Sequence, residues 1–179
     1  RLVDDLLWVC GRDESPARQW RFRSEVGTSV SLAVKDPNTS DRMLNLSASH
    51  GAAGLLGALA AAAANGVEHP GLTQTLANLT KWLRGLDTPD EHGPLWPVGV
   101  GLDTDHHELP AASPSSQIAW CYGAAGMAPA FAVAAEALGD AELREYSVRV
   151  AEGVWSRVRR HEFFSETLCH GMAGVLLIA

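Results

Sequence analysis

Cysteine is scarce in this chain, with three residues among 179. The count is both low and odd, which argues against a secreted domain held together by a framework of disulfides. A reducing cytosol is the more natural setting, and there a cysteine beside a histidine often indicates a bound metal. The sequence therefore predicts a cytoplasmic protein whose cysteines serve chemistry rather than cross-linking.

Positive charge and long apolar runs are also scarce. Lys and Arg number 14 against 21 Asp and Glu, a net charge of −7, and the stretch from Gly85 to Leu143 contains no basic residue. Such a chain is a poor partner for nucleic acid or for an anionic membrane surface. The apolar run from Ala58 to Ala64 is too short to span a bilayer and predicts a buried helix. We therefore expect neither nucleic-acid binding nor a membrane span.

The length of 179 residues, 46% of them hydrophobic, fits one domain with its own core. The chain starts at Arg1 without a methionine and ends in an apolar run, so we expect residues 1–179 to be a single domain or a fragment of one. Residues 87–116 are rich in proline and glycine and predict a long irregular loop. Near the N-terminus, Leu2 to Val9 predicts a helix and Ser29 to Val34 a short strand.

A short motif recurs three times. Each copy begins with a histidine or an aromatic residue, continues as G-x-A-G and leads into a run of small and apolar residues. The copies are Gly51–Gly54, Gly123–Gly126 and Gly171–Gly174. Because the runs lack a polar face, they predict helices that are buried all round. The expected helices cover residues 51–64, 124–138 and a segment that begins near residue 171. Asn65-Gly66 and Gly139-Asp140 predict the turns that follow the first two.

Two further helices are predicted to be amphipathic. Their apolar stripes are Leu72, Leu76, Leu79, Leu83 and Leu86, and then Leu143, Tyr146, Val150, Val154 and Val158. We expect the arginines near the second stripe on its other faces; they are Arg144, Arg149, Arg157 and Arg159. Buried inner helices that alternate with amphipathic outer ones indicate an all-α fold, an α/α toroid with an inner and an outer layer. Closing a ring takes several hairpins and about three are present, so the toroid is expected to be incomplete.

Two cysteines and a histidine occupy equivalent places in two of the repeats. Cys121 and the pair Cys169-His170 each stand just before a predicted helix, where the helix start is expected to lower the pKa of a thiol. Two thiolates and one imidazole would leave the fourth tetrahedral position of zinc open, which is typical of a catalytic site. Because no C-x-x-C pair is present, the spacing alone leaves two buried cysteines and a core histidine as the alternative.

The residues around these positions resemble a known family. Trp120-Cys121-Tyr122-Gly123 and Cys169-His170-Gly171 look like the paired signatures of the lanthionine synthetase C-like cyclases. Ser49 to Gly54 is similar to the upstream H-G-x-x-G motif of that family. The resemblance covers residues 45–179, and its three motifs come in the family's order.

The resemblance implies an α/α toroid with one zinc ion at the mouth of its cavity. Cys121, Cys169 and His170 would bind the zinc, and His50 and Tyr122 would be the catalytic candidates. The implied activity is the addition of a peptide cysteine to dehydroalanine or dehydrobutyrine. This forms the lanthionine and methyllanthionine rings of lanthipeptide antibiotics. The implied partners are a dehydrated precursor peptide and a dehydratase, separate or fused.

Several alternatives stay open. His50 would protonate the enolate that forms when the thiolate attacks the dehydro residue, or it would take the proton of the incoming thiol. The alternative is a helix-start histidine bonded to the backbone. Relatives commonly carry an arginine where Gln117 stands. They also carry a catalytic aspartate well upstream of the histidine, a role that the sequence assigns to none of Asp4, Asp5 and Asp13. Two other functions are alternatives to ring closure. The chain would add glutathione or another thiol to dehydrated residues, or it would serve as a non-catalytic zinc-bearing scaffold that binds a modified peptide.

The remaining candidates have simpler explanations. Cys10 is expected to be a small buried hydrophobic residue. An acidic and histidine-rich group in the long loop is expected to be solvated, with a second metal site as the alternative. This group consists of Asp103, Asp105, His106 and His107.

Overall fold

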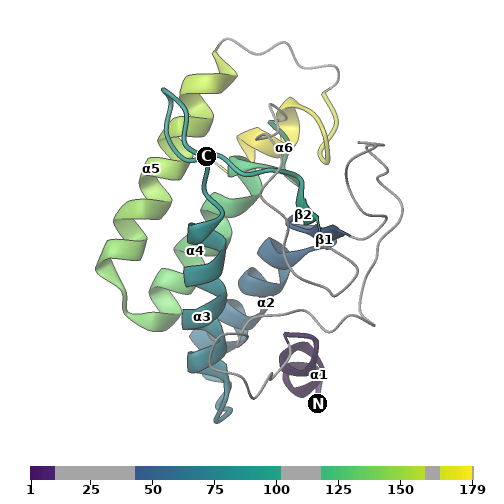
Figure 1. Cartoon of the computed structure of the whole chain (residues 1–179), viewed down its shortest axis with the longest axis vertical. Helices are drawn as coiled ribbons and strands as arrows, with labels where there is room; N and C mark the ends of the chain where they lie inside the picture. The colour runs from purple at the N-terminus through teal and green to yellow at the C-terminus, as the bar shows by residue number, and fades with distance from the viewer. Residues whose placement is uncertain (11–42, 102–117, 160–165, 179) are drawn as a thin grey trace.

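The computed structural model describes residues 1–10, 43–101, 118–159 and 166–178, and it is mostly helical (Figure 1). In chain order the elements are α1 (Leu2–Val9), β1 (Met43–Asn45), α2 (Ala52–Ala64), α3 (Leu72–Gly85), β2 (Gly99–Gly101), α4 (Ala124–Leu138), α5 (Ala141–Val158) and α6 (Met172–Leu176). All the helices expected from the sequence are confirmed. The expectation of an all-α fold is wrong in one detail, because β1 and β2 pair as a small antiparallel sheet.

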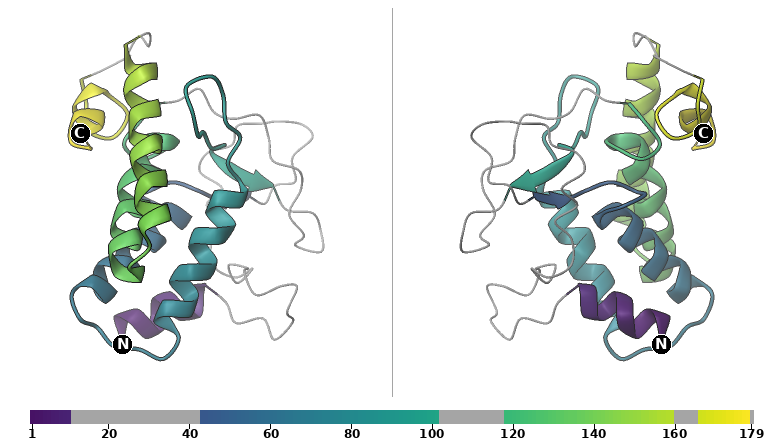
Figure 2. Two further views of the ribbon diagram at one scale, coloured as in Figure 1. Left: turned by 90° about the vertical axis from the view of Figure 1, so that its left-hand side faces the viewer. Right: turned by 90° about the vertical axis from the view of Figure 1, so that its right-hand side faces the viewer.

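Two helical hairpins form the body of the structure (Figure 2). α2 and α4 pack against each other, and each packs against the helix that follows it in the chain, α3 and α5 respectively. The turns lie where the sequence predicts them: Gly66 and Gly139 adopt positive φ angles of 80° and 64° after α2 and α4. Asp140 then caps α5, because its side chain accepts a hydrogen bond from the backbone N–H of Leu143 at 2.9 Å.

The paired hairpins agree with part of the expected architecture. α2 and α4, the predicted inner helices, pack against each other, while α3 and α5, the predicted outer helices, pack against α2 and α4 respectively. A closed ring is not present in the described residues, which hold two hairpins and the beginning of a third unit at α6. The toroid therefore stays a prediction for the whole protein, and the predicted strand from Ser29 to Val34 lies outside the described residues.

Burial follows the predicted pattern with three corrections. On α3 the leucines from Leu72 to Leu83 are buried, whereas Leu86 is only half-buried. The inner helices are not buried all round, because α2 exposes Ala58, Ala61 and Ala64. Among these helices, only the first residues of α4, Ala124 to Ala128, are buried on every side.

The third correction concerns Arg157, which we expected on an outer face of α5. Arg157 is buried, and its guanidinium donates to the carboxylate of Asp90, through Nε at 3.2 Å, and to the carbonyl of Gly93 at 2.8 Å. The hydrogen bond from Arg157 lowers the pKa of Asp90. This pair attaches the segment between α3 and β2 to α5.

That same segment contributes to the core. Trp96 is fully buried, and its ring lies 5.7 Å from the ring of Phe131 on α4 and 6.4 Å from that of Tyr146 on α5. Its indole N–H donates to the carbonyl of Leu83 at 2.7 Å, so the polar atom of this large side chain is satisfied. The segment is thereby fixed, and it leads into β2.

The second glycine of each G-x-A-G motif is needed for the same structural reason in all three copies. A Cβ atom added to Gly126 would lie 2.8 Å from the carbonyl oxygen of Trp120, six residues earlier. A Cβ at Gly54 would likewise overlap the carbonyl oxygen of Ala48, and one at Gly174 that of Leu168. Each loop therefore folds back onto the first turn of its own helix, and only glycine allows this close approach.

Gly54→Ala is expected to destabilise the fold by about 1–3 kcal/mol, because the new methyl group would displace the backbone of Ala48. The matched control is Gly57→Ala in the same helix, where the nearest atom to an added Cβ is that of Ala130 at 4.0 Å. This control should stabilise the protein by up to about 1 kcal/mol through helix propensity. Urea unfolding midpoints measure both changes. Equal effects of the two substitutions would contradict the close-approach explanation.

Candidate metal centre

The loops that precede α2, α4 and α6 meet at one end of the hairpins. The backbone N–H of Ala48, in the first loop, donates to the carbonyl of Cys121 in the second at 2.9 Å. The second and third loops also touch, because a Cβ at Gly174 would lie 2.7 Å from the Cβ of Trp120. The repeat found in the sequence therefore gathers its three copies in space.

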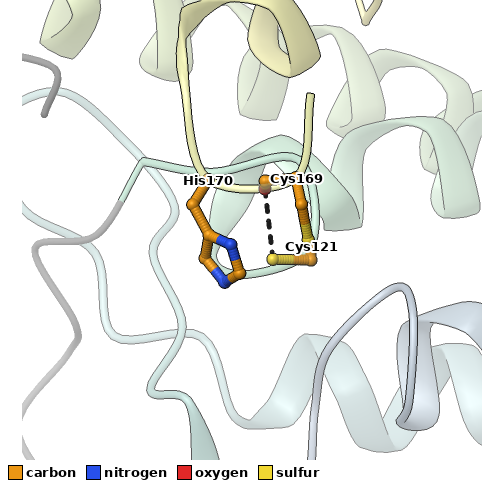
Figure 3. A group of neighbouring side chains, drawn as sticks. All are labelled: Cys121, Cys169 and His170. Carbon is orange, nitrogen blue, oxygen red and sulfur yellow. Dashed lines mark hydrogen bonds between the residues drawn. The ribbon is translucent and has the colours of Figure 1, made fainter. Parts of the chain in front are cut away.

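Three side chains of the second and third loops form a cluster that could hold a metal ion. The ligand atoms of Cys121, Cys169 and His170 all lie within 4.8 Å of one another (Figure 3). Exposure rises across the group, since Cys121 is buried, Cys169 half-buried and His170 exposed. The structure thus brings together the three residues that the sequence suggested, in a group that is closed on the Cys121 side and open on the His170 side.

The chemistry of these donors fits zinc. Two sulfur atoms and one imidazole are ligands that zinc prefers, and three protein ligands leave its fourth tetrahedral position for another molecule. With bond lengths of about 2.0–2.3 Å, ligand atoms around a tetrahedral zinc lie roughly 3.3–3.8 Å apart. The present limit of 4.8 Å is therefore about 1 Å wider than these distances.

The electrostatics of Cys121 differ from our expectation. Burial raises the pKa of the Cys121 thiol to about 12, and the neighbouring Cys169 adds to the effect. The thiol S–H donates to the carbonyl oxygen of Cys169 at 3.2 Å. Burial thus shifts this pKa in the direction opposite to the one expected from the helix start. A thiol in this position loses its proton when a divalent cation binds beside it.

Tyr122 lies beside the cluster without belonging to the ligand group. Its ring centroid is 6.5 Å from that of His170, and the two rings are tilted by 33°. The side chain is buried, and its hydroxyl oxygen accepts a hydrogen bond from Nδ2 of Asn45 at 3.3 Å. The proximity to the metal ligands agrees with the prediction for Tyr122, while its catalytic role stays a prediction.

His50 is exposed at the end of the first loop, directly before α2. Its backbone N–H donates to the hydroxyl of Ser47 at 2.8 Å, and its ring Nδ1 lies 2.9 Å from the hydroxyl of Ser49. Within the described residues it is not part of the metal-ligating group. The partner shown for the ring is thus a side chain and not the backbone, and the catalytic role of His50 stays a prediction.

Sequence reasoning missed Asn45 and Ser47. Both are buried polar residues, and the backbone N–H of Ser47 donates to Oδ1 of Asn45 at 2.8 Å. The available signal was an Asx-turn pattern, an asparagine two residues before a serine, at the point where a strand gives way to a loop. This pattern predicts a local turn but not the long-range contact with Tyr122.

Several other candidates lie away from the cluster or outside the described residues. Asp4, considered as an upstream aspartate, contacts His69 at 3.1 Å beside the α2–α3 turn. Cys10 is buried as predicted, and burial raises the pKa of its thiol to about 12. The candidates that lie outside the described residues are Asp13, Asp103, Asp105, His106, His107 and Gln117. In the part that is described, no helix has the length and apolar character needed to cross a bilayer.

Comparisons with known proteins agree with this arrangement. The family model described as lanthionine synthetase C-like protein matches residues 23–179. Among solved structures, nisin cyclase matches with a TM-score of 0.75 and 21% sequence identity, over 99% of this chain and 43% of that one. This chain therefore spans less than half of the length of that relative. No curated protein matches it significantly.

Proposed function

Because the chain belongs to the lanthionine synthetase C-like family, we propose that it takes part in zinc-dependent closure of thioether rings in a dehydrated peptide. The observation that carries the proposal is the group formed by Cys121, Cys169 and His170, which has zinc-type donors and one open side. A catalytic zinc site needs that open side, because the substrate must reach the fourth position of the metal.

The proposed reaction is an addition in which no atom is lost. The S–H of a peptide cysteine adds across the carbon–carbon double bond of dehydroalanine or dehydrobutyrine. The sulfur bonds to the β-carbon, and a proton ends on the α-carbon. A free cysteine has a pKa near 8.5, so only a small fraction is nucleophilic at neutral pH. Zinc, when bound, lowers the pKa of a coordinated thiol.

The side chains of this chain divide the remaining work. Cys121, Cys169 and His170 hold the metal, and His50 carries the proton, either from the incoming thiol or to the α-carbon. A histidine suits this task because its pKa lies close to neutral. Tyr122, buried beside His170, would help to orient the ring of that ligand.

The substrate sets the place of this reaction in a sequence. A precursor peptide must first lose water at its serine or threonine residues. A dehydratase, separate or fused to this chain, therefore acts earlier. The product is a ring-bearing lanthipeptide of the antibiotic type, made in the reducing cytoplasm where cysteine thiols stay free. Because the chain spans 43% of nisin cyclase, the activity is proposed for the whole protein of which these residues are part.

The test is ring closure by the zinc-loaded protein on a dehydrated peptide with one cysteine and one dehydroalanine. Alkylation of free thiols followed by mass spectrometry should show that the thiol disappears while the peptide mass stays constant. Protein treated with a chelator is the control. A mass increase in the presence of glutathione would instead assign the addition of an external thiol. Persistence of the free thiol with zinc-loaded protein would contradict the proposal.

A further inference from the structure

The segment that leads from the last residue of β1 to α2, residues 45–51, is fixed at several points. Nδ2 of Asn45 donates to the hydroxyl of Tyr122, and Oδ1 of Asn45 accepts the backbone N–H of Ser47. The hydroxyl of Ser47 then accepts the backbone N–H of His50. A Cβ at Gly51 would lie 2.6 Å from the backbone nitrogen of Ser47, so the loop also closes tightly on itself.

We propose that Asn45 is a positioning residue of the metal centre, which holds Tyr122 against His170 and sets the loop that carries His50. The proposal rests on the proposed function, because it assigns to Asn45 a part in that reaction. Asn45 touches neither metal ligand nor substrate in this scheme, and it acts through its two hydrogen-bonded neighbours.

The burial of Asn45 supports a specific use of its polar atoms. Its exposed fraction is 8%, and a buried amide is unfavourable unless its atoms are hydrogen-bonded. A leucine would fill a similar volume at the end of this strand without that requirement. Since the backbone N–H of Ser47 can only donate, the carbonyl side of the amide must face it. The amino side is thereby directed to Tyr122.

The contact joins the two loops that carry the proposed chemistry. Asn45 and Tyr122 are 77 residues apart in sequence, and their hydrogen bond is buried. A second hydrogen bond, from the backbone N–H of Ala48 to the carbonyl of Cys121, joins the same two loops. The backbone tie sets the distance between the loops, whereas the Asn45 side chain sets the orientation of the Tyr122 ring next to His170. Losing the side-chain tie should therefore affect the geometry for catalysis more than the fold.

The first test is Asn45→Leu in the zinc-loaded protein, with tyrosine labelled by carbon-13 at Cζ. We expect the Cζ signal of Tyr122, identified as the one that Tyr122→Phe removes, to shift, while that of Tyr146 stays in place. Zinc content should remain unchanged because no ligand is altered. The rate of ring closure should fall about 10–100-fold, the scale expected when a reacting group is misplaced by up to about 1 Å.

Asn45→Asp is the conservative companion, in case Asn45→Leu does not fold. One carboxylate oxygen keeps the hydrogen bond from Ser47, and the other must accept from the Tyr122 hydroxyl, so the Cζ signal shifts while the rate stays closer to that of the parent. Asn78→Leu is the control: this asparagine of α3 accepts from Gln74 on the surface, and neither signal nor rate should change.

A Tyr122 signal that moves in neither Asn45 variant would overturn the proposal, as would an Asn45→Leu protein with the parent rate. If the unsubstituted protein closes no ring, the proposed function is wrong. A Tyr122 signal that still shifts in the Asn45 variants would then confirm the contact but overturn the role assigned to Asn45.

Discussion

Cys121→Ala should release the metal and abolish ring closure. Cys121 is the most deeply buried member of the cluster, and its thiol is held beside the backbone of Cys169. Structural zinc sites bind with about 10–16 kcal/mol, or roughly 2.5–4 kcal/mol for each of four ligands. Removal of one ligand should therefore weaken zinc binding by roughly 10²–10³-fold. Metal analysis after extensive dialysis measures the loss, against about one zinc per chain in the unsubstituted protein.

Cys10→Ala is the matched control for this experiment. Cys10 is nearly as buried as Cys121, with exposed fractions of 3% and 0%, but it lies at the end of α1 and outside the metal-ligating group. Its replacement removes a small apolar side chain, so stability should fall slightly while zinc content and ring closure persist. A Cys121→Ala protein that keeps one zinc per chain would contradict the ligand assignment.

The sequence predicted the helices well because their signals are local. α1 and α4 begin and end at the predicted residues, since a glycine turn and a change from apolar to polar residues mark the ends of α4. β1 was missed for the opposite reason. Met43–Asn45 is a strand only because Gly99–Gly101 lies beside it, and three residues carry no period that could be recognised.

Arg157 shows how a charged residue can lie on an apolar stripe. It follows Val154 by three residues and Val150 by seven, which places it on the same face of α5 as these buried valines. The guanidinium is compatible with burial because Asp90 accepts from Nε and the carbonyl of Gly93 accepts from Nη2. Those partners come from an irregular segment more than 60 residues away, and no local pattern announces them.

The site was predicted in its residues but not in its electrostatics. The family resemblance supplied Cys121, Cys169 and His170, and the structure places their ligand atoms together. The pKa of Cys121 was expected to fall because only the helix start was visible from the sequence. The raised pKa comes from burial and from Cys169, which lies 48 residues later and joins Cys121 only through the folding of the third repeat.

His50→Asn should slow ring closure by roughly 10²–10⁴-fold while zinc content stays constant. Asparagine fits the exposed position before α2 and lacks a group that exchanges protons near neutral pH, so only the proton-transfer role is removed. His50 is outside the metal-ligating group of the described residues, and its loop is tied to that of Cys121 through Ala48. The rate is measured as the disappearance of the peptide thiol, alongside metal analysis of the same sample.

His69→Asn is the matched control, because it makes the same substitution far from His50. His69 lies beyond the C-terminal end of α2, a helix of 13 residues that separates it from His50, and it contacts Asp4 on α1. A helix of that length spans about 20 Å, so this change should leave the rate untouched.

If His50→Asn instead loses its zinc, His50 is a fourth ligand, no position remains open for the substrate thiol, and the cluster is a structural site. If zinc and rate are both unchanged, the proton is carried by another group. Of the described neighbours, Tyr122 is then the first to replace, because its hydroxyl lies next to the same loop through Asn45.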